Sequence, residues 1–180
     1  GDNHGSPEIP AAYDGVGHFA KMEHWSVIEI KPLDADDCAA MARDMRAADR
    51  LEMAAMAMAD DTYAARLDCL IGLMRKSQGL ARAGYVDGKI VVVYGVIART
   101  ILSSEGHPWL LGSNMVFEPH VQRVMGRRCR RELLAVIPAH VSHLWNLVHS
   151  GNEIAVKWLK WMNFQFDAKP IQHGGLSWLL

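Results

Sequence analysis

The side chains best suited to chemistry lie in the stretch LLGSNMVFEPHVQRVMGRRCRR, residues 110–131. An apolar segment ends at Phe117, Glu118 and Pro119 form a turn, and a helical pattern follows. Free amides at a helix start, a glycine and nearby arginines are the groups that bind phosphate. Cations at that end of a helix are unfavourable unless an anion lies among them. The stretch therefore predicts a phosphate-binding turn.

The arginines that follow the turn cannot all face one ligand, because successive helix positions point in different directions. Arg123, Arg127 and Arg128 lie nearest the turn and are expected to contact phosphate. The net charge of the 180-residue chain is -1, so the cluster is a local feature. The alternative is a basic surface patch for an acidic partner or nucleic acid, although no overall charge excess favours nucleic acid.

Other reactive side chains predict neither a disulfide nor a metal site. The three cysteines, Cys38, Cys69 and Cys129, are widely spaced and form no CxxC pair, which indicates a reducing compartment. Cys129 lies on an apolar helix face and is expected to be a buried thiol. His140 and His143 have the spacing of half a metal site, but no matching carboxylate or cysteine pair lies near them in the sequence.

The elements that position these residues begin with a strand over Trp25–Lys31. A helix capped by Asp34 or Asp36 follows, and Asp60 or Asp61 is expected to cap a further helix. Methionine-rich sequence lies between the two caps and is interpreted as core packing.

Two extended segments, 80–86 and 90–98, are joined by Asp87-Gly88, which is a strong hairpin signal. A loop over 103–107 and a third strand over 108–117 lead into the arginine-rich helix. That helix is expected to end at Pro138.

The last third of the chain predicts short elements. A strand is expected over 144–148, and Asn152 can cap a helix. Short strands are expected over 164–166 and 176–180. The inner side of the Asn152 helix is predicted to comprise Ile154, Ala155, Trp158, Leu159, Trp161 and Met162, and Trp145, Trp158 and Trp161 are expected in the core.

This order predicts an α/β (α+β) fold with a mixed, twisted central sheet and helices on both faces. Residues 1–24 lack apolar periodicity and are expected to form a flexible arm, or a segment that orders against a partner. Residues 25–180 are expected to form a single domain.

The same order and residues resemble the GCN5-related N-acetyltransferase (GNAT) family. In that family a Q/R-x-x-G-x-G/A loop opens a helix and holds the pyrophosphate of acetyl-CoA. Arg123 and Gly126 match this pattern, whereas Arg128 stands where Gly or Ala is expected. A later family signature is echoed by Asn152, Ala155, Trp158 and Phe164, with Leu159 at the place of the usual general-acid tyrosine and Asn163 at that of a glycine.

The resemblance implies an acyl-CoA N-acyltransferase-like fold and direct transfer of acetyl from acetyl-CoA to an amine of unknown identity. It implies that the amides of Met115, Val116 and Phe117 face the pantetheine and thioester. The further cofactor-binding residues that it implies are Arg123, Gly126, Arg127, Arg128 and Asn152. Glu118 is the best-placed base and His120 the second candidate. The alternatives are that Glu118 only stabilises the helix start and that His120 is an exposed loop histidine.

The segment Met41–Met53 further resembles a phage branch of the fold that includes internal virion proteins of T7-like phages. This implies an alternative, a non-catalytic virion or assembly protein with homo-oligomeric or phage structural partners. No apolar run approaches the roughly 20 residues of a membrane span. Together these features predict a cytoplasmic location, or a virion if the phage resemblance holds.

Overall fold

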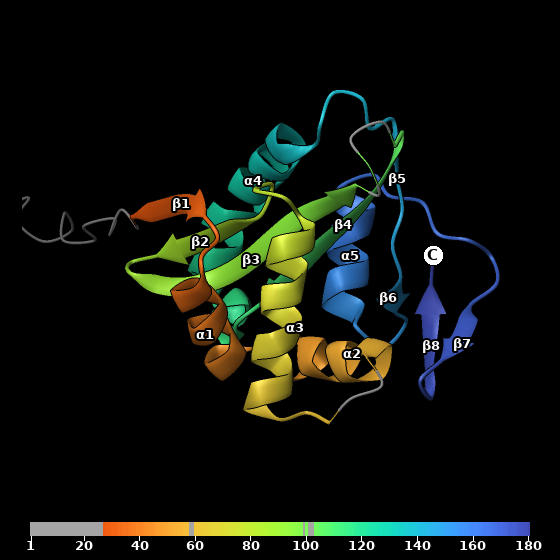
Figure 1. The fold of residues 1–180 in the computed structure, drawn as a ribbon, viewed down its shortest axis with the longest axis horizontal. Coiled ribbons are helices and arrows are strands. Elements are labelled where there is room, and N and C mark those ends of the chain that lie inside the picture. Colours follow the sequence, from red (N-terminus) through yellow and green to blue (C-terminus); the bar gives the residue numbers. More distant parts are fainter. Residues whose placement is uncertain (1–26, 58–59, 99, 101–102) are drawn as a thin grey trace, which may run out of the picture.

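The computed structural model describes residues 27–57, 60–98, 100 and 103–180, and the predicted arm lies outside this range. Figure 1 shows a sheet of five strands in the order β1-β2-β3-β4-β5 beside a smaller sheet in the order β6-β8-β7. The strands are β1 (Ile28–Pro32), β2 (Arg82–Val86), β3 (Lys89–Ala98), β4 (Glu105–Gly112), β5 (His143–Leu144), β6 (Val148–His149), β7 (Ile171–His173) and β8 (Leu176–Leu179). The helices are α1 (Ala35–Asp44), α2 (Ala47–Ala57), α3 (Tyr63–Lys76), the 3-10 helix η1 (Asn114–Phe117), α4 (Pro119–Val136) and α5 (Glu153–Trp161).

The cap of α1 is one that the sequence predicted, whereas the cap of α3 is a different residue from those predicted. The Asp34 side chain accepts from the amide of Asp37 and caps α1, and the Asp37 side chain accepts from the amide of Asp34, which completes a capping box. At α3 the cap is Thr62, whose hydroxyl accepts from the amide of Ala65. The expectation of Asp60 or Asp61 was wrong because the Asp61 carboxylate is bound by Arg66 instead.

The predicted hairpin is confirmed, with Asp87 and Gly88 both at positive φ, as a two-residue type I′ turn requires. The following strand lies earlier in the chain than predicted. β4 runs from Glu105 to Gly112, so most of the predicted loop over 103–107 is strand and the predicted strand end over 113–117 is not. The buried Ser113 side chain accepts from the amide of Met115 and starts η1 in place of further strand.

The segment after α4 also differs from the prediction. α4 ends at Val136, just before Pro138, as expected. The predicted strand over 144–148 is two short strands, of which β5 pairs with β4 in parallel and β6 pairs with β8. Residues 164–166 form no strand, and β7 was missed. Each of these strands is two to four residues long, which is too short for a periodic pattern.

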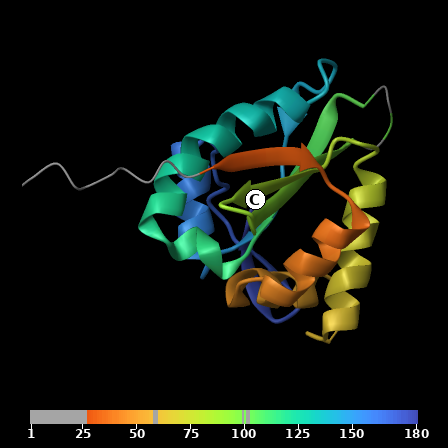
Figure 2. The same ribbon diagram turned by 90° about the vertical axis from the view of Figure 1, so that its left-hand side faces the viewer.

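Helices cover both faces of the larger sheet, as Figure 2 shows in a view from the side. One buried cluster joins α1, α2 and α3 to one face, and a second joins α4 and α5 to the other. Trp158 packs against the second cluster as predicted. Trp145, Ile154 and Trp161 are exposed. The predictions that Ile154 and Trp161 lie on the inner side of α5, and that Trp145 and Trp161 lie in the core, were therefore wrong.

Candidate functional site

The two sheets separate between β4 and β6, and the separation proceeds in steps along β4. At Gly106 the carbonyl accepts a main-chain bond from the amide of Trp145 at 3.1 Å. At Pro108 the carbonyl is reached only by the side-chain amide of Asn146, at 2.6 Å. Beyond that point β6 turns away to pair with β8. We call the region between residues 108–112 of β4 and residues 146–149 the β4–β6 split.

One residue of β4 presents an unpaired main chain to this split. In an antiparallel pair, alternate residues bond the neighbouring strand and the others face away. Ser113 bonds β3 through its amide, at 2.8 Å from the carbonyl oxygen of Val91, so Gly112 and Leu110 face the split. In the described part of the chain, the N–H and C=O of Leu110 have no hydrogen-bond partner.

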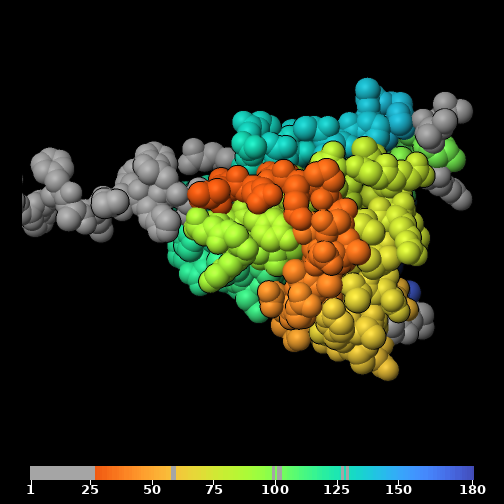
Figure 3. All heavy atoms as spheres, turned by 60° about the vertical axis from the view of Figure 1, so that its left-hand side comes forward, coloured from red at the N-terminus to blue at the C-terminus, as the bar shows by residue number. Residues whose placement is uncertain are grey.

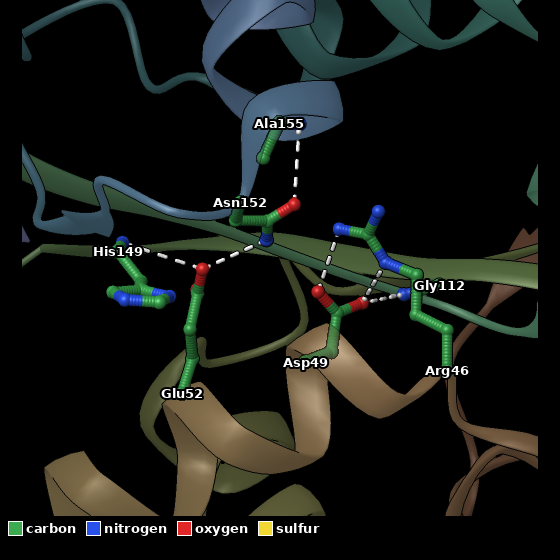
Figure 4. Close-up of polar contacts among 7 residues, drawn as sticks. All are labelled: Arg46, Asp49, Glu52, Gly112, His149, Asn152 and Ala155. Carbon is green, nitrogen blue, oxygen red and sulfur yellow. Dashed lines mark hydrogen bonds and ion pairs between the residues drawn. The ribbon is translucent and has the colours of Figure 1, made fainter. Parts of the chain in front are cut away.

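The start of α2 contacts β4 at Gly112, two residues after Leu110 (Figure 4). The amide of Arg46 donates to the carbonyl of Gly112 at 3.0 Å, and the carboxylate of Asp49 accepts from the amide of Gly112 at 2.6 Å. The Arg46 guanidinium binds both oxygens of Asp49, at 2.7 and 2.6 Å. Both side chains are buried, so the charges compensate each other out of contact with water.

Glu52, one turn further along α2, makes the corresponding contact on the other side of the split. Its Oε1 accepts from the side-chain amide of Asn152 at 2.7 Å and from the main-chain amide of His149 at 3.3 Å. Burial raises the pKa of the Glu52 carboxyl to about 7, because desolvation disfavours the charged form. The Asn152 Oδ1 accepts from the amide of Ala155 and caps α5, as predicted.

The predicted pyrophosphate loop is part of a helix. Residues 123–128 lie inside α4, which begins at Pro119, so their amides bond preceding carbonyls of the helix and cannot cradle a phosphate. The amides without an acceptor in the helix are those of His120 and Val121. A Cβ placed on Gly126 would meet no heavy atom within 4 Å outside its own helix backbone, so packing does not require glycine there.

The arginines of α4 have separate positions. Arg123 is exposed one turn after the helix start. The Arg128 guanidinium binds the carboxylate of Glu132 at 3.1 Å. Arg127 directly precedes Arg128 in α4. Of the three arginines, Arg123 thus lies closest along α4 to the free amides, and among the described side chains no contact joins Arg123 or Arg128 to Asn152.

The predicted pantetheine-binding amides lie in η1, and two of the three are bonded to Ser113. Met115 donates to the hydroxyl of Ser113 at 3.3 Å, and Val116 donates to the carbonyl of Ser113 at 3.2 Å. Phe117 is the last residue of η1, and its side chain is exposed. The amides of Met115 and Val116 are therefore already engaged within the chain.

A cavity of about 560 Å³ lies beside η1 and contains two predicted site residues, Met115 and Glu118. Figure 3 looks on to the face where β1, the β2–β3 hairpin and α1 lie side by side. The charged side chains of the cavity are Arg43, Asp44, Lys89 and Glu118, and no ion pair joins any of them to the described part of the chain. His120 does not line this cavity.

The residues that sequence reasoning missed are Leu110 and Gly112 on β4 and Arg46, Asp49 and Glu52 on α2. A signal was present, because Arg46, Asp49 and Glu52 recur at every third position in a segment otherwise rich in alanine and methionine. Within the described ranges, no group of three His, Cys, Asp or Glu side chains could hold a metal ion. No described helix is both long and apolar enough to cross a membrane.

No protein-family model and no curated protein matches the sequence. Solved structures do share the fold. The GNAT domain of S. lividans PAT matches with a TM-score of 0.59 and 12% identity, over 87% of this chain and 96% of that one. A putative acetyltransferase, yncA from Salmonella typhimurium with its cofactor acetyl-CoA, matches with a TM-score of 0.54 and 12% identity, over 84% and 91%. The PaiA N-acetyltransferase from Thermoplasma acidophilum in complex with coenzyme A matches with a TM-score of 0.52 and 13% identity, over 85% and 97%.

The chain therefore has the mixed α/β fold of GNAT acyl-CoA N-acyltransferases, with a mostly antiparallel central sheet and helices on both faces. The predicted fold class is confirmed. The further resemblance to internal virion proteins of phages receives no support from the structures that share the fold.

Proposed function

We propose that the chain is an N-acyltransferase that uses acetyl-CoA as cosubstrate and transfers its acetyl group to an amine. One observation carries the proposal. On a fold shared with proteins solved with acetyl-CoA or coenzyme A, no described residue bonds the N–H or C=O of Leu110 at the point where the sheets separate.

The free edge at Leu110 suits an extended ligand that contains amide groups. An exposed strand edge binds such a ligand by main-chain hydrogen bonds, as a further strand would. The pantetheine arm of coenzyme A is a chain with two amide groups, and each can donate and accept. Because Asp49 and Arg46 already bond Gly112, only the one amide and one carbonyl of Leu110 remain for the ligand.

The start of α4 suits the phosphate groups. The amides of His120 and Val121 are free of helix bonds, the helix dipole favours an anion there, and Arg123 lies one turn further along. This moves the proposed phosphate contacts from residues 126–128 to the first turn of α4. The thioester supplies an activated acyl group, and the protein must hold it and take a proton from the amine.

Calorimetric titration with acetyl-CoA tests the proposal. We expect saturable binding by the wild type. Leu110→Pro removes the free N–H, and proline is tolerated at a strand edge where no ladder bond is lost. We expect at least a tenfold weaker affinity for this variant, since one hydrogen bond of about 1 kcal/mol and access to the edge are both affected.

Leu110→Ala is the matched control, because it shortens the side chain and keeps the N–H. We expect its affinity to stay within about threefold of the wild type, with circular dichroism showing that both variants are folded. No binding by the wild type at millimolar acetyl-CoA, or equal loss in the proline and alanine variants, would contradict the proposal.

A protein that keeps the fold without the chemistry is the second candidate. The observation that favours it is that the amides of Gly112, Met115 and Val116 are already bonded within the chain. It predicts no acetyl-CoA binding by the wild type, so the same titration separates the two candidates.

A further inference from the structure

α2 places two carboxylates at the β4–β6 split, one on each side of it. Figure 4 shows Asp49 directed toward Gly112 of β4, and Glu52 directed toward His149 of β6 and Asn152. Each carboxylate bonds a strand amide that the neighbouring strands leave unpaired. Because residues two apart on a strand are separated by about 7 Å, the Asp49 carboxylate lies beside the free edge at Leu110, and Glu52 follows Asp49 one turn further along α2.

We infer that Glu52 is the catalytic residue that accepts the proton of the amine in the proposed acetyl transfer. This inference rests on the proposed function and adds to it the identity of the base. It replaces the sequence-based candidates Glu118 and His120, which are solvent-exposed beside η1 and at the start of α4.

The contacts of the two α2 carboxylates differ in the one respect that matters for a base. Both oxygens of Asp49 are bonded to Arg46, and one of them also accepts from Gly112. In Glu52 only Oε1 has partners, and Oε2 accepts no hydrogen bond from the described part of the chain. A base must have an oxygen that is free to accept the proton, and in Glu52 that oxygen is Oε2.

The charges around Glu52 suit proton transfer near neutral pH. The pKa is raised to about 7, first by burial and then by the carboxylate of Asp49. The hydrogen bonds from Asn152 and His149 and the charge of Arg46 lower the pKa but do not offset the burial. A base with a pKa near the working pH is both available and strong enough to take the proton.

An ammonium group gives one proton to Oε2 of Glu52, and the freed nitrogen lone pair forms the bond to the acyl carbon. The carbon–sulfur bond breaks with its electron pair on sulfur, and the second proton lost from the nitrogen passes to that sulfur. Glu52 then releases its proton to solvent, so the base is restored.

Glu52→Gln tests the inference, because glutamine keeps an oxygen for Asn152 and His149 but cannot take a proton. The probes are acetyl-CoA with a panel of small amines, including hydroxylamine, spermidine and amino acid amides, and the readout is thiol release. We expect acetyl-CoA affinity within about threefold of the wild type and a turnover at least about 100-fold lower. The rising limb of the wild-type pH–rate profile near pH 7 should be absent from the variant.

A second readout does not depend on turnover. Infrared difference spectra between the wild type and Glu52→Gln report the ionisation of this one carboxyl, and we expect a midpoint near pH 7. A midpoint near 4.5, the ordinary value for glutamate, would overturn the inference.

The possible failures are distinguishable. A wild type that does not bind acetyl-CoA removes the proposed function, and the role of Glu52 with it. Normal turnover and an unchanged pH profile in Glu52→Gln remove only the inference. If the rising limb of the pH–rate profile is lost in Glu118→Gln and kept in Glu52→Gln, the base is Glu118 and not Glu52. A wild type that binds acetyl-CoA but acetylates no amine of the panel also overturns the inference.

Discussion

Asp49 and Glu52 lie one helical turn apart and meet different electrostatic surroundings. Asp49 is buried against the guanidinium of Arg46, which compensates its charge. Glu52 is largely buried with only neutral donors in contact, the amides of Asn152 and His149. The first carboxylate therefore stabilises the closed end of the split, and the second carries a charge that the fold tolerates poorly.

The raised pKa of Glu52 predicts how stability depends on pH. The folded value of about 7 exceeds the ordinary 4.5, so the folded state binds this proton more tightly than the unfolded state. The stabilisation is complete below pH 4.5 and is lost as the pH rises to 7. It amounts to at most about 3 kcal/mol.

Denaturant unfolding of the wild type and of Glu52→Gln between pH 4.5 and pH 8 measures the contribution of Glu52 to stability. The contributions of other titrating groups cancel when the free energies of unfolding of the two proteins are subtracted. We expect the variant to gain stability relative to the wild type as the pH rises, and to be the more stable protein at pH 8. A difference that stays constant over this range would contradict the environment assigned to Glu52.

At the scale of elements, sequence patterns correctly predicted those turns and helix ends that depend only on neighbouring residues. The Asp87-Gly88 hairpin, the cap at Asp34 and the end of α4 before Pro138 follow from the residues that occupy those turns. The end of β4 was misplaced because Ser113 forms its turn only when buried against β3, where its hydroxyl donates to the carbonyl of Ile90.

The candidate site was only partly predictable for a related reason. Glu118 and Arg123 were identified from a local motif, and the motif correctly marked a strand–helix junction. The contacts of Asp49 and Glu52 join residues 63 and about a hundred positions apart. Such contacts have no period in the sequence, so no pattern along the chain predicts them.

The start of α2 should be the part of the site most sensitive to substitution. Asp49→Asn leaves the Arg46 guanidinium buried without a compensating charge, and we expect a loss of about 3 kcal/mol in the free energy of unfolding. Lys157→Ala is the control, because its pair with Glu153 is exposed and should contribute no more than about 0.5 kcal/mol. Urea unfolding of both variants measures the difference.

A loss for Asp49→Asn no larger than that of the control would mean that α2 does not depend on this ion pair for its position at β4. The closed end of the split would then need another explanation, and the restriction of the free edge to Leu110 would lose its structural basis.

At the scale of the whole molecule, the division of one sheet into two is the feature that makes a site. A continuous sheet would pair every main-chain group of β4, as the bond from Trp145 does at Gly106. β6 pairs with β8 instead, so other groups bond the edge of β4. The Asn146 side chain bonds Pro108 and α2 bonds Gly112, whereas no described group bonds Leu110. In the described part of the chain this leaves the main chain of Leu110 open, and we propose that the ligand binds there.

Amide hydrogen exchange at Leu110, measured by NMR with and without acetyl-CoA, tests this claim most directly. In the free protein we expect this amide to exchange faster than its neighbours Trp109 and Leu111, whose positions on β4 bond β3. Saturating acetyl-CoA should slow exchange at Leu110 by at least about tenfold, as a bound acceptor would. Binding of acetyl-CoA with unchanged exchange at Leu110 would contradict the account.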